Sequence, residues 1–375
     1  MIPQIFTINL LQFASGDRSS IQVYRFCGSK PGKKAYLQAN LHGAEIVGNG
    51  VIHQLIEFFS TLEANQLEGE VWLVPVCNPL ATNQRNHFFS TGRFNSYDGK
   101  DWNRIFWDYE KEEQDLEAFA RAQLNQKIEI IRQSYLQQIL ACFQKKIAEI
   151  NSPQSLPWTE QYRYHLQSLC LDANYVIDIH SSSNQAIDYL YCFPNREESA
   201  QYFLLEHGIL MDRYDGYAFD EAFLKPWLGL EKELAKQGRE VRFDLESWTL
   251  ELGSGMIMEV SSVAKGVAGI KNYLLSKGML HSIPNLNPVA TDIRLANKSK
   301  ILKYYAPVGG MVQKLIKIGT KVKPNTELYQ IINFNRDGKV PTVIKVCADT
   351  DGLVFDSVTN HAVNQGDYIL SLFRY

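Results

Sequence analysis

Short β-prone runs that alternate with helix-period segments are the feature that most constrains the fold of this chain. The runs occupy residues 35–40, 70–76, 175–179 and 247–252, and polar residues or Gly/Pro signals bound each of them. After the first run, residues 46–63 place apolar side chains on one helical face. Strands that alternate with helices predict an α/β sheet that is covered by helices on both faces.

The length of the chain and an internal repeat predict a second, smaller domain. A single core seldom grows past about 250–300 residues, and this chain has 375. Residues 306–331 match residues 348–372 when one residue is dropped. The matched positions are Ala306 with Ala348, Gly310 with Gly352, Val312 with Val354, Val322 with Val363, and Thr326 with Asp367. We therefore expect one domain at residues 1–298 and another at 299–375.

The repeated halves predict two β-hairpins that pack into a small all-β barrel-sandwich. This pattern resembles the biotinyl/lipoyl-carrier barrel, whose halves share the same glycine, valine and turn positions. The connecting hairpin, residues 333–342, lacks the Met-Lys-Met or Asp-Lys-Ala sequence that presents the modified lysine in that family. We therefore interpret Lys339 as an ordinary turn lysine and the module as a structural or gating accessory.

Residues 109–170 differ in composition from the rest of the chain. They are rich in Glu, Lys, Gln, Ala and Leu, and their only helix-breaking signals are the prolines in SPQSLP, residues 152–157. We expect one or two long helices inserted into the α/β core, and we interpret their charge as a solvated face.

The charge balance and the cysteines narrow the class of partner and the compartment. Lys and Arg total 38 against 41 Asp and Glu, so neither nucleic acid nor an anionic membrane is predicted as a partner. A small-molecule substrate is the default expectation. The six cysteines show no C-x-x-C spacing, and no window reaches the roughly 18 apolar residues of a membrane span. The N-terminus shows no signal-peptide pattern, so we expect a cytoplasmic protein. The protein can be a monomer or a homo-oligomer.

His42 and Glu45 form the first candidate pair. They follow the strand run at residues 35–40 and precede a helix, the edge where open α/β sheets bind ligands. The pair can be the first two ligands of a metal. It can also be structural, with His42 bonded to a backbone carbonyl and Glu45 favoured by the dipole of the helix. The pair alone leaves both interpretations open.

His180 is the best-placed partner for that pair. A catalytic zinc usually takes three protein ligands, and two histidines with one carboxylate are a standard set. The segment YVIDIHSSS ends a hydrophobic strand in His180. Asp178, two residues earlier on the same strand face, can hold a ligand imidazole or can be a buried structural carboxylate. The remaining histidines fit surface or packing positions better: His53, His87, His165, His207, His281 and His361.

Metal-assisted hydrolysis also needs a base near the metal. Glu251 ends the strand run at 247–252 just before a Gly-rich turn, and Glu259 lies nearby at the start of a helix-period segment. We favour Glu251, because catalytic groups collect at strand ends on the ligand-binding edge. Glu259 is then a cap or a structural carboxylate.

Arginines in Asn- and Gly-rich loops are candidates for binding a substrate carboxylate, since the planar guanidinium binds carboxylates in a bidentate manner. Arg85 follows an Asn-Pro pair, and Arg104 follows Asn103 in DWNR. Surface solvation is the alternative for each, and we accept it for Arg93.

Taken in order, HGAE, NP with a downstream Arg, DWNR, DIH and a strand-end Glu resemble the succinylglutamate desuccinylase/aspartoacylase family of the zinc-carboxypeptidase superfamily. The motifs span roughly residues 35–255. The resemblance implies a mixed α/β sheet with helices on both faces, a β-rich C-terminal domain and one zinc ion per chain. It assigns the matched residues as follows: His42, Glu45 and His180 as zinc ligands, Glu251 as general base, and Asn103, Arg104 and Arg85 as groups that hold the substrate carboxylate or polarise the scissile carbonyl.

The leading hypothesis from the sequence is a zinc-dependent amidohydrolase, a deacylase that cleaves the amide bond of a small N-acyl amino acid. One alternative is a zinc carboxypeptidase that acts on peptides. A second alternative is a non-catalytic binding protein built around the C-terminal barrel.

Overall fold

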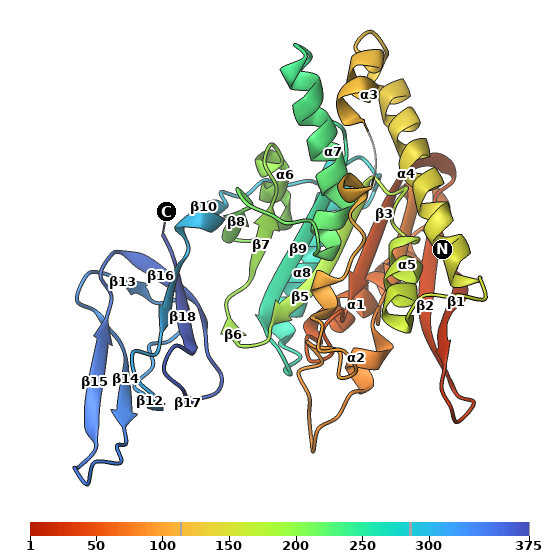
Figure 1. Cartoon of the computed structure of the whole chain (residues 1–375). Helices are drawn as coiled ribbons and strands as arrows, with labels where there is room; N and C mark the ends of the chain where they lie inside the picture. Colours follow the sequence, from red (N-terminus) through yellow and green to blue (C-terminus); the bar gives the residue numbers. More distant parts are fainter. Residues whose placement is uncertain (113–114, 285–286, 375) are drawn as a thin grey trace.

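The main body of the molecule is a mixed β-sheet (Figure 1). The computed structural model describes residues 1–112, 115–284 and 287–374. Among these residues the sheet has nine strands in the order β1-β2-β4-β3-β5-β9-β7-β8-β10. Their bounds are β1 Gln4–Gln12, β2 Arg18–Cys27, β3 Lys30–Ala39, β4 Glu68–Val74, β5 Tyr175–Ser182, β7 Tyr189–Cys192, β8 His207–Leu210, β9 Glu246–Ser254 and β10 Arg294–Asn297. The predicted mixed α/β fold is confirmed.

The four predicted strand runs lie in β3, β4, β5 and β9, near the middle of this sheet. The N-terminal hairpin of β1 and β2 is not among the predicted strands. Its residues alternate between exposed and buried along β1, because this edge of the sheet packs on one face only. Such short alternations carry a weaker signal than the continuous apolar runs of the buried central strands.

Helices cover both faces of the sheet. On one face, α1 and α8 share a core with β3, β5 and β9. On the other face, α4, α5 and α7 pack into a larger core that includes several tryptophans. The helix bounds are α1 Val47–Thr61, α2 Pro79–Asn83, α3 Leu116–Gln123, α4 Ile128–Ile150, α5 Trp158–Gln167, α6 Glu197–Ala200, α7 Phe219–Lys236 and α8 Val260–Ser276, with short 3-10 turns at Ala64–Gln66, Trp102–Arg104, Tyr109–Lys111, Gln201–Phe203 and Lys298–Lys300.

The region expected to be a helical insertion, residues 109–170, contains α3, α4 and α5. Positions 113–114 of that range lie outside the described residues. Helix α4 is amphipathic: Ile131, Tyr135, Ile139 and Phe143 recur every four residues and are buried in the core that α4 shares with α5 and α7. The outer face of α4 carries its charged residues.

The central strands of the sheet position the candidate site residues. Strands β3, β5 and β9 are parallel neighbours, so their carboxyl ends meet at one edge of the sheet. His42 follows β3, His180 lies near the end of β5, and His180 faces Glu251 of β9 in strand register. Residues that are far apart in the sequence are therefore adjacent at this edge.

The C-terminal residues form antiparallel sheets beside the main body (Figure 1). In the part of the chain that the structure describes, one sheet has the order β11-β18-β16-β13 and the other β15-β14-β12-β17. Their strands are β11 Leu302–Tyr305, β12 Gly310–Gln313, β13 Lys321–Val322, β14 Glu327–Asn333, β15 Thr342–Cys347, β16 Gly352–Ser357, β17 Ala362–Val363 and β18 Tyr368–Phe373.

The internal repeat appears in reciprocal backbone hydrogen bonds between the halves. The Ala306 N–H donates to the carbonyl of Asp367, and the matched Ala348 N–H donates to the carbonyl of Thr326, each at 2.8 Å. Strand β12 of the first half pairs with β17 of the second, and β16 pairs with β13. Each half therefore completes the sheet of the other.

The C-terminal sheets are joined to the main body by a strand pair and an apolar cluster. Strand β6 (Gln185–Ala186), just beyond β5, pairs antiparallel with β16. Tyr189 and Ile209 of the main body pack with Phe355 and Phe373 of the C-terminal sheets. This contact brings β16 and β18 next to the edge of the main sheet that carries His180.

Candidate metal centre and active site

The turn between β3 and α1 presents His42 and Glu45. Asn40 directly follows β3 with a left-handed backbone (φ 69°), and its side-chain amide donates to the carbonyls of His42 and Gly43. Gly43 leaves no room for a side chain, because a Cβ there would lie 2.0 Å from the carbonyl oxygen of Ala81. The turn is thereby fixed in the shape that points both side chains toward β5.

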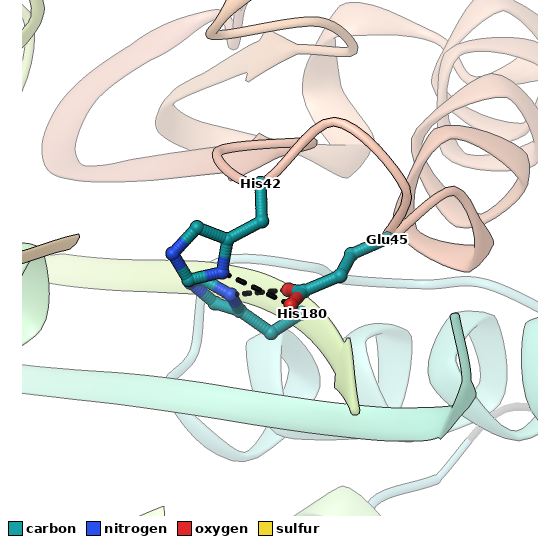
Figure 2. A group of neighbouring side chains, drawn as sticks. All are labelled: His42, Glu45 and His180. Carbon is teal, nitrogen blue, oxygen red and sulfur yellow. Dashed lines mark hydrogen bonds and ion pairs between the residues drawn. The ribbon is translucent and has the colours of Figure 1, made fainter. Parts of the chain in front are cut away.

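His42, Glu45 and His180 converge on one point (Figure 2). The Glu45 carboxylate lies between the two imidazoles, with Oε1 at 3.0 Å from His42 Nδ1 and Oε2 at 2.7 Å from His180 Nδ1. One ligand atom from each residue lies within 4.8 Å of the others, and all three side chains are buried.

A second carboxylate holds the far side of each imidazole. Asp178 Oδ2 is 2.8 Å from His180 Nε2, and Asp101 Oδ1 is 3.0 Å from His42 Nε2. An ionised carboxylate only accepts hydrogen bonds, so these contacts assign a hydrogen to each Nε2 and turn each Nδ1 toward Glu45. Of the two sequence interpretations of Asp178, the hydrogen bond to an imidazole is the one found here.

The charges of this cluster depend on one another. Burial lowers the pKa of His42 and His180, but the Glu45 and outer carboxylates outweigh it and raise both pKa values. Burial raises the pKa of Glu45, yet the two imidazoles hold that pKa far below its usual range. Burial also raises the pKa of Asp101, but the hydrogen bond from His42 and the charge of Arg93 outweigh it and lower this pKa to about 2.

The donor set fits a divalent metal. With both Nε2 atoms protonated, each Nδ1 can approach Glu45 only if the imidazole gains a second proton or a cation lies between them. Two imidazole nitrogens and a carboxylate are a common set for catalytic zinc, and outer carboxylates that orient the imidazoles are typical of such sites.

A cavity of about 710 Å³ opens beside the cluster. Glu251 lines it, and one carboxylate oxygen of Glu251 is buried without a hydrogen-bond partner. Burial raises the pKa of Glu251 to about 7, although the charges of His180 and Arg93 partly oppose this. Glu259, the alternative base, is exposed where α8 begins and does not line this cavity.

Arg93 reaches the cluster and Arg85 does not. Arg85 is exposed and bonds only to nearby carbonyls in its own loop, whereas Arg93 lines the cavity. The Nε atom of Arg93 lies 3.1 Å from Asp101 Oδ2, and Nη1 lies 3.9 Å from Glu45 Oε1. Backbone bonds from residues 43 and 44 to carbonyls 92 and 91 hold this loop against the ligand turn. The sequence interpretation of Arg93 as a solvated surface residue is wrong.

Asn103 and Arg104 line the same cavity. The amide oxygen of Asn103 accepts a bond from the Phe219 N–H, which leaves its amide hydrogens for a ligand. The Arg104 side chain is exposed and donates to the Asn103 carbonyl at 2.6 Å. Asp101 belongs to the same DWNR segment, and no role is predicted for it from the sequence.

The chain matches known proteins over part of its sequence and over its whole fold. Residues 31–139 match the model of the succinylglutamate desuccinylase/aspartoacylase catalytic domain. A crystal structure of a protein assigned to that family from Shewanella amazonensis is 27% identical, covers 99% of this chain and 98% of its own, and superposes with a TM-score of 0.86. No curated protein matches the chain in sequence.

Two further structures share the fold. One, from Shewanella frigidimarina and assigned to the same family, is 24% identical with a TM-score of 0.88 over 99% of this chain and 97% of that one. The other is the product-bound ectoine utilization protein of Ruegeria pomeroyi, 15% identical with a TM-score of 0.67 over 100% of this chain and 96% of that one. In the described residues no helix is long and apolar enough to cross a membrane.

Proposed function

Because the chain belongs to the succinylglutamate desuccinylase/aspartoacylase family, we propose that it is a zinc-dependent deacylase of small N-acyl amino acids. One observation carries the proposal: a buried His-Glu-His cluster lies at the wall of a cavity that also contains Glu251. Metal-assisted hydrolysis requires a set of metal ligands and a base beside the metal, and a carboxylate can serve as that base.

His42, Glu45 and His180 would hold the metal, with Asp101 and Asp178 fixing the two imidazoles. When bound, zinc would polarise the scissile carbonyl and lower the pKa of water at the site. Ser183 adds a further constraint, because its hydroxyl donates to Glu45 Oε1 at 3.2 Å and so limits rotation of that carboxylate.

Glu251 would move the protons. It lies on β9 directly beside His180, and its pKa near 7 suits a group that both takes and returns a proton at neutral pH. Its carboxylate would accept a proton from the attacking water and deliver it to the leaving amine nitrogen. The products are a carboxylate and a free amine.

The reaction involves two negative charges, one that develops on the acyl oxygen and one on the substrate carboxylate, and different side chains would stabilise each. Arg93 replaces Arg85 as the candidate for stabilising the developing charge on the acyl oxygen, because its guanidinium lies beside the metal ligands. Asn103 and Arg104 would bind the carboxylate of the substrate from another part of the same cavity wall.

The test combines metal content and substrate. The purified protein should contain about one zinc per chain and hydrolyse N-acetyl amino acids, and the double variant His42→Ala, His180→Ala should lose both properties. A short peptide series run in parallel separates a deacylase from a carboxypeptidase. Preference for the peptides would reassign the chain to the second class, and a wild type that binds no zinc when offered it would overturn the proposal.

A further inference from the structure

The C-terminal sheets place a carboxylate in the wall of the substrate cavity. Asp356 of β16 lines the cavity together with Tyr368 and Ser371 of β18. Its Oδ2 accepts a hydrogen bond from Ser182 at 2.5 Å, and its Oδ1 accepts bonds from Tyr368 at 2.5 Å and Asn184 at 3.5 Å. Ser182 is two residues beyond His180, so this carboxylate is a near neighbour of the metal cluster.

Asp356 forms no ion pair within the described residues. Its hydrogen bonds from Ser182, Tyr368 and Asn184 all come from neutral donors, and no Lys, Arg or His nitrogen of the described chain lies within ion-pair distance of it. Lys303 lines the same cavity without forming an ion pair with Asp356; burial raises the pKa of Asp356, and the charge of Lys303 only partly opposes this. The Asp356 residue is only 9% exposed. Buried carboxylates are normally paired with a cation, and a cationic group bound in the cavity would supply that partner.

Aromatic rings flank the same part of the cavity. Tyr189 pairs with Glu251 across the antiparallel β7–β9 ladder, and its ring meets that of Phe355 edge to face at 5.4 Å. Phe355 directly precedes Asp356, and Tyr191 and Tyr368 also line this cavity. Aromatic rings therefore line the cavity wall between Glu251 and Asp356. A carboxylate among aromatic rings is a suitable environment for an ammonium group.

We propose that Asp356, with the tyrosines around it, binds a protonated amine of the substrate. The substrate class is then N-acyl compounds that carry, besides the scissile amide and a carboxylate, a second and cationic amino group. This inference rests on the proposed deacylase function and specifies its substrate.

Matched substrate pairs test the proposal. Nα-acetylornithine and Nα-acetylnorvaline differ by one amine on the amino-acid half, and 4-aminobutyryl-alanine and butyryl-alanine differ by one amine on the acyl half. We expect kcat/KM of the wild type to be higher for the amine-bearing member of at least one pair, by about tenfold or more. Equal or lower kcat/KM for the amine-bearing member of both pairs would overturn the proposal.

Two variants locate the preference. Asp356→Asn keeps the shape, and its amide can accept from one of the Ser182 and Tyr368 hydroxyls and donate to the other, so it should fold but lose the preference, mainly through a higher KM for the amine-bearing member. The control Asp351→Asn changes an exposed carboxylate just before the same strand, outside the cavity lining, so it should keep the preference. A preference that survives in Asp356→Asn, with an unchanged melting temperature, contradicts the assignment.

The outcomes also separate this inference from the proposed function. Hydrolysis of uncharged or anionic N-acyl amino acids without any amine preference leaves the deacylase intact and removes only the role of Asp356. No hydrolysis of any N-acyl compound by zinc-loaded protein rejects both.

Discussion

Glu251 and His180 face each other in register on the parallel strands β9 and β5. The register places the candidate base and a candidate metal ligand at the same height of the sheet, so their separation is set by two buried strands and not by a loop. Both strands are almost fully buried along their length. The geometry of the two groups should therefore persist when either side chain is changed.

We expect Glu251→Gln to lower kcat by about 10²- to 10⁴-fold, the usual contribution of a general base. Glutamine has the same shape but does not take a proton at neutral pH. Zinc content should stay at the wild-type level, because Glu251 is not one of the three clustered ligands. Elemental analysis and steady-state kinetics on the same sample check both statements.

The matched control for this variant is Glu259→Gln, which changes an exposed carboxylate at the start of α8. It should retain wild-type kcat. Full activity in Glu251→Gln together with a loss in Glu259→Gln would exchange the roles of the two glutamates.

Asp101 and Asp178, which hold the far side of the two imidazoles, should strengthen the binding of zinc. Asp101→Asn and Asp178→Asn each weaken the hold on one imidazole, since an amide can present a donor to Nε2 where the carboxylate can only accept. We expect each change to weaken zinc binding by about 10- to 100-fold. Competition with a chromogenic chelator measures this, and Glu57→Gln on the exposed side of α1 is the control. Unchanged zinc affinity in both Asp variants would mean that these contacts do not orient the ligands.

The contrast between two arginines gives a further prediction. Arg93→Ala should lower kcat/KM by about 10²- to 10³-fold, the loss typical of a group that stabilises an oxyanion. Arg85→Ala should remain close to wild type, because Arg85 is exposed and bonds only to carbonyls of its own loop. A thermal melt of both variants excludes unfolding as the cause. Equal losses in the two variants would assign Arg93 no special role.

Sequence reasoning succeeds here where local pattern and sheet geometry coincide. His42 and His180 each terminate an apolar run, and parallel neighbouring strands must end at the same edge. Glu251 satisfies the same rule on β9, whereas Glu259 lies beyond the strand. The paired halves of the C-terminal sheets are also visible in the sequence, because reciprocal pairing requires similar residues at matched positions.

The residues that sequence reasoning missed lie where no helix or strand periodicity in the sequence indicates their position. Arg93 lies in the irregular loop between α2 and the turn at Trp102–Arg104, and long-range contacts with residues 43–45 hold this loop against the His-Glu-His cluster. Asp356 is separated from His180 by most of the second half of the chain, and the pairing of β6 with β16 brings them together. Long-range pairing of this kind leaves no local signal.

The pH dependence of activity follows from Glu251. The group acts as a base only when ionised, and burial raises its pKa to about 7. The ionised fraction, and with it kcat/KM, should therefore fall as the pH drops below this value, by up to tenfold per unit. A cation held by His42, Glu45 and His180 favours the ionised form and shifts this acid limb toward lower pH. Initial rates at low substrate concentration, measured from pH 5 to 9 with zinc occupancy checked at each end, test the expectation. A profile that is flat between pH 5 and 8 at constant zinc occupancy would show that Glu251 is not the titrating base.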